Sequence, residues 1–386
     1  MPIPYGRQSI SQDDINAVID VLKSDRITQG PSIEKFENAV ANYCGTSYAV
    51  AVNSATSALH VACLAAGLAP NDILWTSPNT FVASANCALY CGASVDFVDI
   101  DPFSYNLSTA CLESKLKEAL KKKALPKVII PVHFAGQSCD MAAIGEMSKR
   151  YGFSVIEDAS HAIGAKYRGE PVGSCTFSDM TVFSFHPVKI ITTGEGGMIL
   201  TNKKELYEKL CRLRSHGITR DPSHMVAESA GPWYYEQVEL GFNYRITDIQ
   251  AALGASQLQR LNEFVSRRNF LAERYSKKMK DLPLQLPAIH SACYSAWHLY
   301  VVRLQLTRMN RSHKEVFEML SGAGVQVNLH YIPVHMQPFY RARGFNIGDF
   351  PHAEQYYKEV ISLPLFYELS ETDQDYVIDQ LRQIVT

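Results

Sequence analysis

Short runs of β-branched and aromatic residues alternate with helical stretches between about residues 45 and 200, and this alternation narrows the possible folds more than any other feature. Runs such as SYAVAV, KVIIPVHF and FSVIEDA have the character of buried strands, whereas SATSALHVACLAAG has helical spacing. Strands that alternate with helices predict a mainly parallel sheet covered by helices. Ligands of such sheets bind beyond the carboxyl ends of the strands, so residues at those ends are the first candidates for chemistry.

The pattern changes after about residue 240. The stretch TDIQAALGASQLQRLNEFVSRRNFLAERYSKKM predicts one long helix that begins at a capping box, Thr247-x-x-Gln250. Strand-like AWHLYVVRLQL and helical ETDQDYVIDQLRQIV follow it and outline a smaller α/β unit. Because 386 residues exceed one ordinary core, we expect a large domain over residues 1–255 and a smaller C-terminal domain over residues 256–386.

Composition argues against several classes of protein. The formal net charge is −2 and the basic residues are dispersed, so no nucleic-acid surface is expected. The longest apolar segment, ALHVACLAAGLA, is too short to span a membrane, and the start of the chain lacks a basic stretch followed by an apolar one. Nine cysteines without a C-x-x-C pair indicate reduced thiols and neither disulfides nor zinc. We therefore expect a cytoplasmic protein without a metal site.

The segment NSATSAL follows the strand YAVAV and opens a helix with small polar residues. A helix start of this kind exposes free backbone N–H groups and binds phosphate. The alternative is an ordinary helix cap by Asn53 or Ser54, and the segment alone does not separate the two.

Two carboxylates and a histidine follow another strand in IEDASHA. Asp158 is the sharper candidate, because a carboxylate there could hydrogen-bond a protonated ring nitrogen of a cofactor. The alternative for Asp158 is an acid that caps the following turn, and the alternative for His161 is a structural histidine.

A single lysine, Lys189, lies in the otherwise apolar and glycine-rich stretch FSFHPVKIITTGEGGMIL, just past the strand MTVFSF. Burying an ammonium is costly, but a lysine held as an imine to a carbonyl cofactor carries no simple ammonium. The alternative is a lysine that reaches to solvent from a strand end. Gly194, Gly196 and Gly197 follow the lysine and fit neither nucleotide-binding glycine motif, so we expect them to form a tight turn against a ligand.

Together these segments resemble the DegT/StrS-type sugar-nucleotide aminotransferases, which are fold-type I pyridoxal-phosphate (PLP) enzymes. The resemblance spans nearly the whole chain and includes seven motifs in the order of the family: ITQGP, NSATSAL, NTFVASANC, VHFAGQSCDM, VIEDASHAIGA, FSFHPVKIITTGEGGM and GFNYRITDIQAALG. It implies a large domain with a mostly parallel seven-stranded sheet between helices and a smaller C-terminal α/β domain.

The resemblance also implies roles around the cofactor ring. Lys189 would form the imine with PLP and, once displaced by the amino donor, move the proton between the cofactor and substrate carbons. Asp158 would pair with the pyridinium nitrogen, Phe81 would stack on the ring, and His161 would lie near the ring hydroxyl.

Further residues would hold the cofactor phosphate. Ala55 and Thr56 would bind it through the helix start, and Ser184 would add a hydroxyl. Asn243 would reach the phosphate bound by the other subunit, so the resemblance implies a homodimer with shared active sites.

A branch of the family has histidine in place of the lysine and dehydrates its substrate, so Lys189 implies transamination, with L-glutamate as the donor. The acceptor would be a nucleotide-linked 4-keto-6-deoxy sugar. Arg245 and the stretch VNLHYIPVHMQPFY, with His330, Tyr331 and His335, look like the region that meets it; a structural loop or a two-histidine zinc site are the alternatives.

Among acceptors, the motifs are most similar to those of enzymes that aminate C4 of UDP-2-acetamido-2,6-dideoxy-β-L-arabino-hexos-4-ulose on the way to pseudaminic acid. A UDP-4-keto-pentose or a dTDP-4-keto-6-deoxyhexose is the alternative acceptor. A PLP-binding regulator without turnover is a second alternative. The third and weakest alternative is a nicotinamide-dependent sugar-nucleotide dehydrogenase. Such an enzyme needs a dinucleotide-binding fingerprint after the first strand, and this chain has SATSAL at that position.

Overall fold

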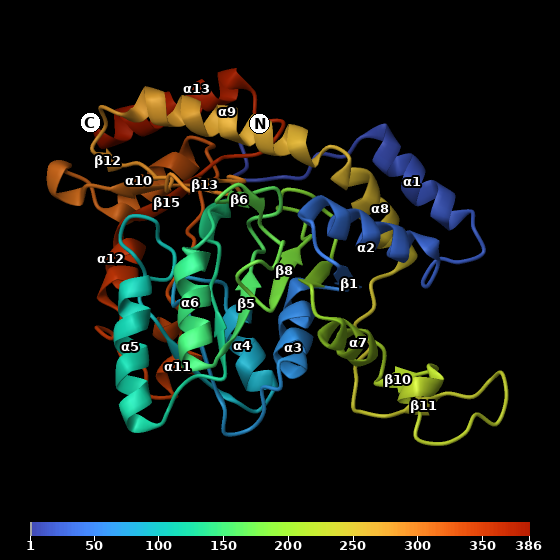
Figure 1. Ribbon diagram of the computed structural model, residues 1–386. Helices are drawn as coiled ribbons and strands as arrows, with labels where there is room; N and C mark the ends of the chain where they lie inside the picture. Colours follow the sequence, from blue (N-terminus) through green and yellow to red (C-terminus); the bar gives the residue numbers. More distant parts are fainter. Residues whose placement is uncertain (1) are drawn as a thin grey trace.

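The computed structural model describes residues 2–386, and a seven-stranded sheet forms its centre (Figure 1). The strand order is β1-β9-β8-β5-β4-β2-β3; the pairs from β8 to β3 are parallel, and β9 is antiparallel to both neighbours. The mostly parallel seven-stranded sheet predicted from the sequence is confirmed. Its strands are β1 (Tyr48–Val52), β2 (Ile73–Thr76), β3 (Ser94–Phe97), β4 (Val128–Ile130), β5 (Ser154–Asp158), β8 (Met180–Ser184) and β9 (Gly197–Thr201).

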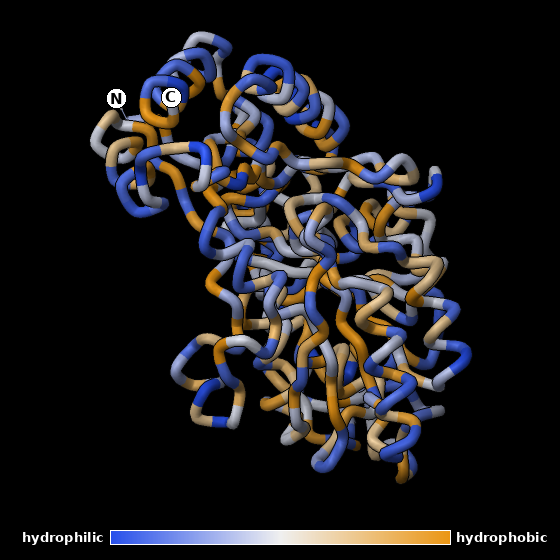
Figure 2. Tube along the Cα trace, turned by 90° about the vertical axis from the view of Figure 1, so that its left-hand side faces the viewer, coloured by the Kyte–Doolittle hydropathy of each residue, from blue (hydrophilic) through white to orange (hydrophobic). Residues whose placement is uncertain are grey.

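Helices cover both faces of this sheet because strand side chains point alternately to either side. In β4, Val128 and Ile130 join the apolar cluster of one face, whereas Ile129 joins a cluster on the other. In Figure 2, hydrophobic stretches of the chain, coloured orange, accordingly run through the middle of the molecule. The first face carries α3 (Ala55–Ala65), α4 (Ala83–Tyr90) and α7 (Lys204–Leu213), and the second carries α2 (Pro31–Cys44), α5 (Thr109–Lys122), α6 (Met141–Tyr151) and α8 (Asp248–Leu258).

The stretch predicted as one long helix is two helices, α8 and α9 (Leu261–Met279), so that prediction is wrong in this respect. Its predicted start is confirmed, because Thr247 and Gln250 form the capping box. Arg260 leaves helical geometry at φ −101° and ψ 5°. Because of this break, the two helices pack against different elements. α8 packs against α1 (Gln12–Leu22) and α2, whereas α9 packs against α13 (Glu371–Val385).

A second, antiparallel sheet lies in the C-terminal part with the order β12-β14-β15. The chain then returns to the large sheet, where Tyr340 and Tyr356 join the apolar cluster of α3 and α4. In the opposite direction, Ile3 near the start of the chain forms a β-bridge with Val325 of the C-terminal part. Chain segments thus cross the expected boundary at 255/256 in both directions, and that division stays a prediction. The elements of this part are β12 (Leu284–Gln285), β14 (Tyr300–Leu304), α10 (His313–Gly322), α11 (Pro338–Arg341), α12 (Pro351–Glu359) and β15 (Val360–Leu363).

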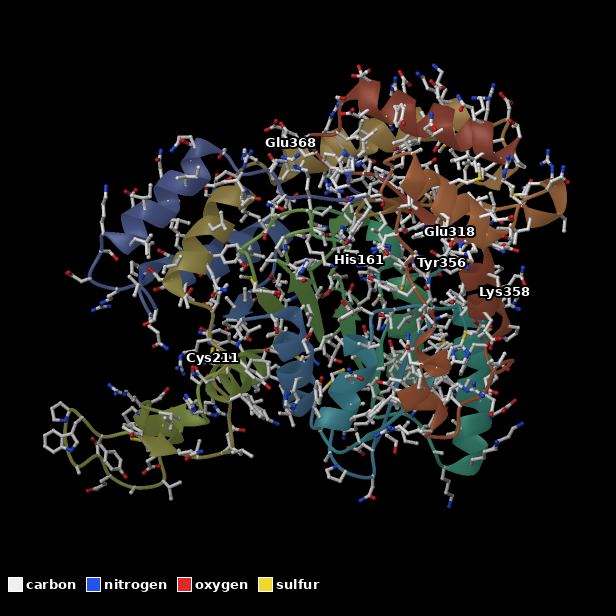
Figure 3. All side chains as sticks on the ribbon, turned by 180° about the vertical axis from the view of Figure 1, so that it is seen from behind. His161, Cys211, Glu318, Tyr356, Lys358 and Glu368 are labelled. Atoms are coloured by element: carbon white, nitrogen blue, oxygen red, sulfur yellow. The ribbon has the colours of Figure 1, made fainter. Side chains whose placement is uncertain are left out.

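A two-stranded arm, β10 (Ile218–Thr219) and β11 (Glu236–Gln237), stands away from the body of the molecule (Figures 1 and 3). Within residues 2–386, no helix combines the length and apolar character that crossing a membrane requires. The remaining short elements are the strands β6 (Lys166–Tyr167), β7 (Glu170–Pro171) and β13 (Cys293–Tyr294) and the 3-10 turns at Phe134–Gly136, Pro222–His224, Leu306–Arg308 and Val334–Met336.

Candidate active site

A cavity of 570 Å³ lies at the carboxyl ends of β5 and β8, where the sequence placed the candidate residues. The two strands are parallel, so their last residues, Asp158 and Ser184, meet at the same edge of the sheet. Figure 3 shows one lining residue, His161, in the middle of the molecule. The predicted residues that line the cavity are Ala55, Thr56, Phe81, Asp158, His161, Ser184, Lys189, His330 and Tyr331.

The start of α3 forms one wall of this cavity. Ser54 caps the helix by accepting a hydrogen bond from the backbone N–H of Ser57 at 3.1 Å, so the ordinary cap considered for this segment is present. Ala55 and Thr56 occupy the first turn and line the cavity. First-turn N–H groups have no partner within their helix, so capping and anion binding are compatible here.

Gly197 lets β9 approach this helix start closely. A Cβ atom at Gly197 would lie 2.6 Å from the backbone nitrogen of Ala55, closer than real Cβ contacts come. Gly194, three residues earlier, has a φ of +78°, which favours glycine. The chain therefore bends at Gly194, and Gly197 fixes the spacing between β9 and the first turn of α3. Contact of this turn with a ligand stays a prediction.

The two consecutive carboxylates of β5 point to opposite faces of the sheet. Asp158 lines the cavity and accepts hydrogen bonds from Ser84 and Ser160. Glu157 lies on the other face and accepts from Ser178 and Thr181, with His133 at 2.5 Å. Of these two carboxylates, only Asp158 is therefore placed to meet a ligand, and Glu157 has a structural position.

Lys189 is half-buried and lines the cavity. Within residues 2–386, no carboxylate oxygen lies within ion-pair distance of its ammonium. Burial lowers the pKa of Lys189 to about 8, although the charge of Asp158 acts in the opposite direction. At pH 7, roughly a tenth of a group with such a pKa is a neutral amine, the form that attacks a carbonyl.

His161 is fixed in one tautomer by its neighbours. Its Nδ1 accepts from the backbone N–H of Ala135 at 3.2 Å, and its Nε2 lies 3.1 Å from the hydroxyl of Tyr331. Burial and the charge of Lys189 lower the pKa of His161 well below its ordinary value. The neutral ring must carry its proton on Nε2 and donate it to the oxygen of Tyr331. The proton of Tyr331 is then available to a ligand.

The other predicted residues lie in three different settings. His330 lines the cavity, and its Nδ1 lies 2.8 Å from the hydroxyl of Ser362. His335 is fully buried and pairs with Glu354, away from the cavity lining. Asn243 and Arg245 do not line the cavity of their own chain, and Asn243 is exposed.

Sequence reasoning missed several lining or supporting residues. His298 lines the cavity and packs against His161, with ring centroids 4.3 Å apart and the ring planes tilted by 47°. Its buried Nδ1 has no hydrogen-bond partner within residues 2–386. Thr80 lies shortly before α4 and Ser84 lies in its first turn, and both are buried. The motif NTFVASANC contained both, but only Phe81 within it received a role.

Comparison with known proteins gives this cavity its context. Residues 8–382 match the DegT/DnrJ/EryC1/StrS aminotransferase family. The chain belongs to this family. It is therefore an aminotransferase, as the sequence predicted, and the resemblance stated above is confirmed.

Individual relatives match this chain over nearly their whole length. A UDP-4-amino-4,6-dideoxy-N-acetyl-beta-L-altrosamine transaminase of Campylobacter jejuni (strain 81-176) is 37% identical over 99% of this chain and 97% of its own. The structure of Helicobacter pylori PseC, described as an aminotransferase involved in the biosynthesis of pseudoaminic acid, superposes with a TM-score of 0.90 at 30% identity and covers 100% of this chain and 99% of its own.

A third relative identifies the cofactor. The PLP form of Spr1654 from Streptococcus pneumoniae superposes with a TM-score of 0.88 at 29% identity, over 100% of this chain and 98% of its own. The fold is that of the fold-type I PLP enzymes, and PLP is the cofactor of this aminotransferase.

Proposed function

We propose that this enzyme transfers an amino group from L-glutamate to C4 of a UDP-linked 4-keto-6-deoxy-N-acetylhexosamine, a step of pseudaminic acid synthesis. The observation that carries the proposal is the position of Lys189, a half-buried amine with a pKa of about 8 that shares one cavity with Asp158 and the start of α3. Full-length similarity to the Campylobacter transaminase supports the choice of acceptor.

The residues present fit PLP. When bound, PLP supplies an aldehyde that condenses with amines and a ring that withdraws electrons from the reacting carbon. Lys189 would hold the aldehyde, and Asp158 would accept a hydrogen bond from the protonated ring nitrogen. The first turn of α3 and the hydroxyl of Ser184 would hold the phosphate. Phe81, which is 60% exposed and lines the cavity, offers an apolar face for the ring.

Lys189 would also carry the proton during amino transfer. Once the amino donor displaces it, its neutral amine can take a proton from the donor carbon and return it to a neighbouring carbon. A pKa of about 8 suits this role, because both the free base and its protonated form are present near neutral pH.

The acceptor would lie against the far wall of the cavity. His330 and Tyr331 line that wall, and Tyr331 has a hydroxyl proton to donate. Burial and the charge of Lys189 lower the pKa of His330 to about 3, so this ring is neutral and recognises polar groups rather than phosphate charge. Arg245, outside the cavity of its own chain, would supply charge to the acceptor.

A homodimer would complete the site with Asn243 of a second copy. The arm exposes large apolar residues, with Val226 at 91%, Trp233 at 72% and Leu240 at 78% exposure. α1 exposes Ile15 and Ile19 one turn apart. Apolar surface of this extent on a projecting arm and a helix favours a second copy as the partner. The homodimer and the cytoplasmic location stay predictions.

Amino transfer to three acceptors tests the proposal. The PLP-loaded protein is given L-glutamate with UDP-2-acetamido-2,6-dideoxy-β-L-arabino-hexos-4-ulose, a UDP-4-keto-pentose or a dTDP-4-keto-6-deoxyhexose, and kcat/KM for the C4 amine is compared. We expect the first acceptor to be turned over fastest and Lys189→Ala to abolish turnover of all three. Faster turnover of a pentose or dTDP sugar would assign a different acceptor. Binding of PLP without any amino exchange would identify a regulator.

A further inference from the structure

Two hydroxyl groups donate to the carboxylate of Asp158, and a third hydroxyl group contacts one of them, so that all three belong to one hydrogen-bonded chain. Oδ2 of Asp158 accepts from the hydroxyl of Ser84 at 2.6 Å, and Ser84 lies 2.8 Å from the hydroxyl of Thr80. Oδ1 accepts from both the hydroxyl and the backbone N–H of Ser160, at 2.6 and 3.1 Å. Thr80, Ser84 and Asp158 are all at most 5% exposed. Such short bonds to a buried carboxylate are of the strong, charge-assisted kind.

The direction of this chain follows from the number of protons. An ionised carboxylate only accepts, so Ser84 must give its single hydroxyl proton to Asp158. Thr80 must then donate to the oxygen of Ser84, because that oxygen has no other proton to offer. Successive donors polarise one another, so Thr80 strengthens the bond from Ser84 to Asp158.

The two carboxylate oxygens of Asp158 differ in how many further hydrogen bonds each can accept. Oδ1 already accepts two hydrogen bonds, both from Ser160. Oδ2 accepts one within residues 2–386, from Ser84. Each carboxylate oxygen accepts about two hydrogen bonds. Oδ2 is therefore the oxygen that has room for a further donor.

We propose that Thr80, Ser84 and Ser160 are positioning residues that hold the carboxylate of Asp158 and present its Oδ2 to the ring nitrogen of PLP. The proposal rests on the role given to Asp158 under the proposed function. A proton shared by the ring nitrogen and Oδ2 stays on the nitrogen only while the carboxylate is the weaker base. Hydroxyl donors stabilise the carboxylate and so favour the charged pair.

The link between α4 and β5 has a second consequence. Ser84 lies in the first turn of α4, three residues after Phe81, and its backbone N–H donates to the Phe81 carbonyl. The bond from Ser84 to Asp158 therefore ties the segment that carries Phe81 to the end of β5. The apolar wall and the carboxylate of the cavity are held at a fixed spacing by one side chain.

The test uses PLP labelled with ¹⁵N in the ring, bound to the full-length protein. Ser84→Ala and Ser160→Ala should each move the ¹⁵N resonance toward that of an unprotonated ring and lower kcat by about ten- to a hundredfold, since each removes a hydrogen bond to a charged group. Thr80→Val should have a smaller effect of the same sign. Ser160→Thr, which keeps the hydroxyl, should resemble the wild type in both measurements.

Ser148→Ala is the matched control, because Ser148 also donates a 2.6 Å hydrogen bond, to the carbonyl of Phe153, but lies on α6 and outside the cavity lining. It should leave the resonance and kcat unchanged. Serine variants that match the wild type in both readouts would overturn the positioning role and leave the proposed function standing. A wild-type protein whose bound ring nitrogen is unprotonated would overturn this inference even if amino transfer proceeds. Absence of amino exchange by the wild type would instead reject the proposed function.

Discussion

The hydroxyl oxygen of Tyr331 lies 3.1 Å from Nε2 of His161, and this contact joins two segments 170 residues apart. His161 follows β5, whereas Tyr331 belongs to the stretch that returns from the C-terminal part to the large sheet. Because the neutral His161 donates to Tyr331, the phenol proton of Tyr331 is free for a ligand in the cavity that Tyr331 lines.

Tyr331→Phe tests this arrangement. The change leaves the buried N–H of His161 without an acceptor, which should lower the free energy of unfolding by about 1–3 kcal/mol. It should also lower kcat by about tenfold or more, because a hydrogen bond to the ligand is lost. Urea unfolding and steady-state assays measure the two effects. Tyr376→Phe, on the exposed face of α13, is the control; equal effects of both changes would contradict a special role for Tyr331.

The lowered pKa of Lys189 predicts a pH-dependent stability of the cofactor-free protein. The unfolded chain binds the lysine proton up to about pH 10.5, whereas the folded chain releases it near pH 8. The unfolded state therefore binds more protons between these values, and the free energy of unfolding rises with pH across this window. Below pH 8 the full cost of burying the ammonium remains.

Lys189→Met should consequently stabilise the cofactor-free protein at pH 7 by up to about 3 kcal/mol, and the gain should disappear near pH 10.5. Chemical unfolding at a series of pH values measures the difference from wild type. Lys314→Met, with an 82% exposed side chain, is the control and should show no such window. The rate at which wild type takes up PLP should rise with pH and level off near pH 8; a rate that is flat from pH 6 to 9 would contradict the lowered pKa.

The position of the site could be predicted from sequence because parallel strands share a carboxyl edge. Asp158 ends one apolar strand, β5, and Lys189 follows another, β8. Because β5 and β8 are adjacent and parallel, local patterns sufficed to predict that both residues reach one cavity. The face to which each side chain points also follows from strand alternation, which separates Asp158 from Glu157.

Contacts between distant segments could not be predicted in this way. Ser84 meets Asp158 across 74 residues, and a serine in the first turn of a helix has the sequence signature of an ordinary helix end. No proline or glycine lies at the break between α8 and α9, so the sequence does not predict it. The break arises because α8 and α9 pack against different helices. His298 lies just before β14 and lines the cavity. The residues around it have only the pattern of a strand start, and nothing in that pattern predicts a catalytic or binding role.

Asp158 and Glu157 should respond differently to loss of charge. Asp158→Asn should keep the fold but weaken PLP binding and lower kcat by about a hundredfold, because the ring nitrogen loses its anionic partner. Glu157→Gln should leave the spectrum of bound PLP unchanged but lower the free energy of unfolding by about 2–4 kcal/mol, because it breaks a buried hydrogen-bonded pair with His133. Visible spectra and thermal unfolding of both variants distinguish the roles.

The same pair sets a pH dependence. Burial raises the pKa of Glu157, but hydrogen bonds from His133, Ser178 and Thr181 outweigh it and lower the pKa overall. The stabilisation is therefore complete above the ordinary glutamate pKa and is lost as the pH falls through the lowered value. The difference in stability between wild type and Glu157→Gln should shrink below about pH 4; a constant difference down to pH 3 would contradict it.

Shared active sites predict complementation between two inactive variants. If Asn243 acts on the cofactor of the other copy, Lys189→Ala and Asn243→Ala proteins should each be nearly inactive alone. A mixed dimer has one site with an intact lysine and an intact asparagine from its partner, so a mixture should recover about a quarter of wild-type activity. No recovery after subunit exchange, verified by mass measurement of the mixed dimer, would place Asn243 in the site of its own chain or outside any site.

Gly197 should be intolerant of even one added methyl group. In Gly197→Ala the new Cβ would meet the backbone nitrogen of Ala55 at 2.6 Å, so β9 and the first turn of α3 must separate. We expect a loss of about 1–3 kcal/mol in the free energy of unfolding and weaker binding of PLP, because the turn expected to hold the phosphate moves.

Gly322→Ala, at the exposed end of α10 with no atom within 4 Å of the new Cβ, is the control. It should be neutral or stabilising by less than about 1 kcal/mol. Calorimetry and PLP titration measure both variants, and unchanged PLP affinity in Gly197→Ala would show that the spacing of β9 and α3 does not control the phosphate site.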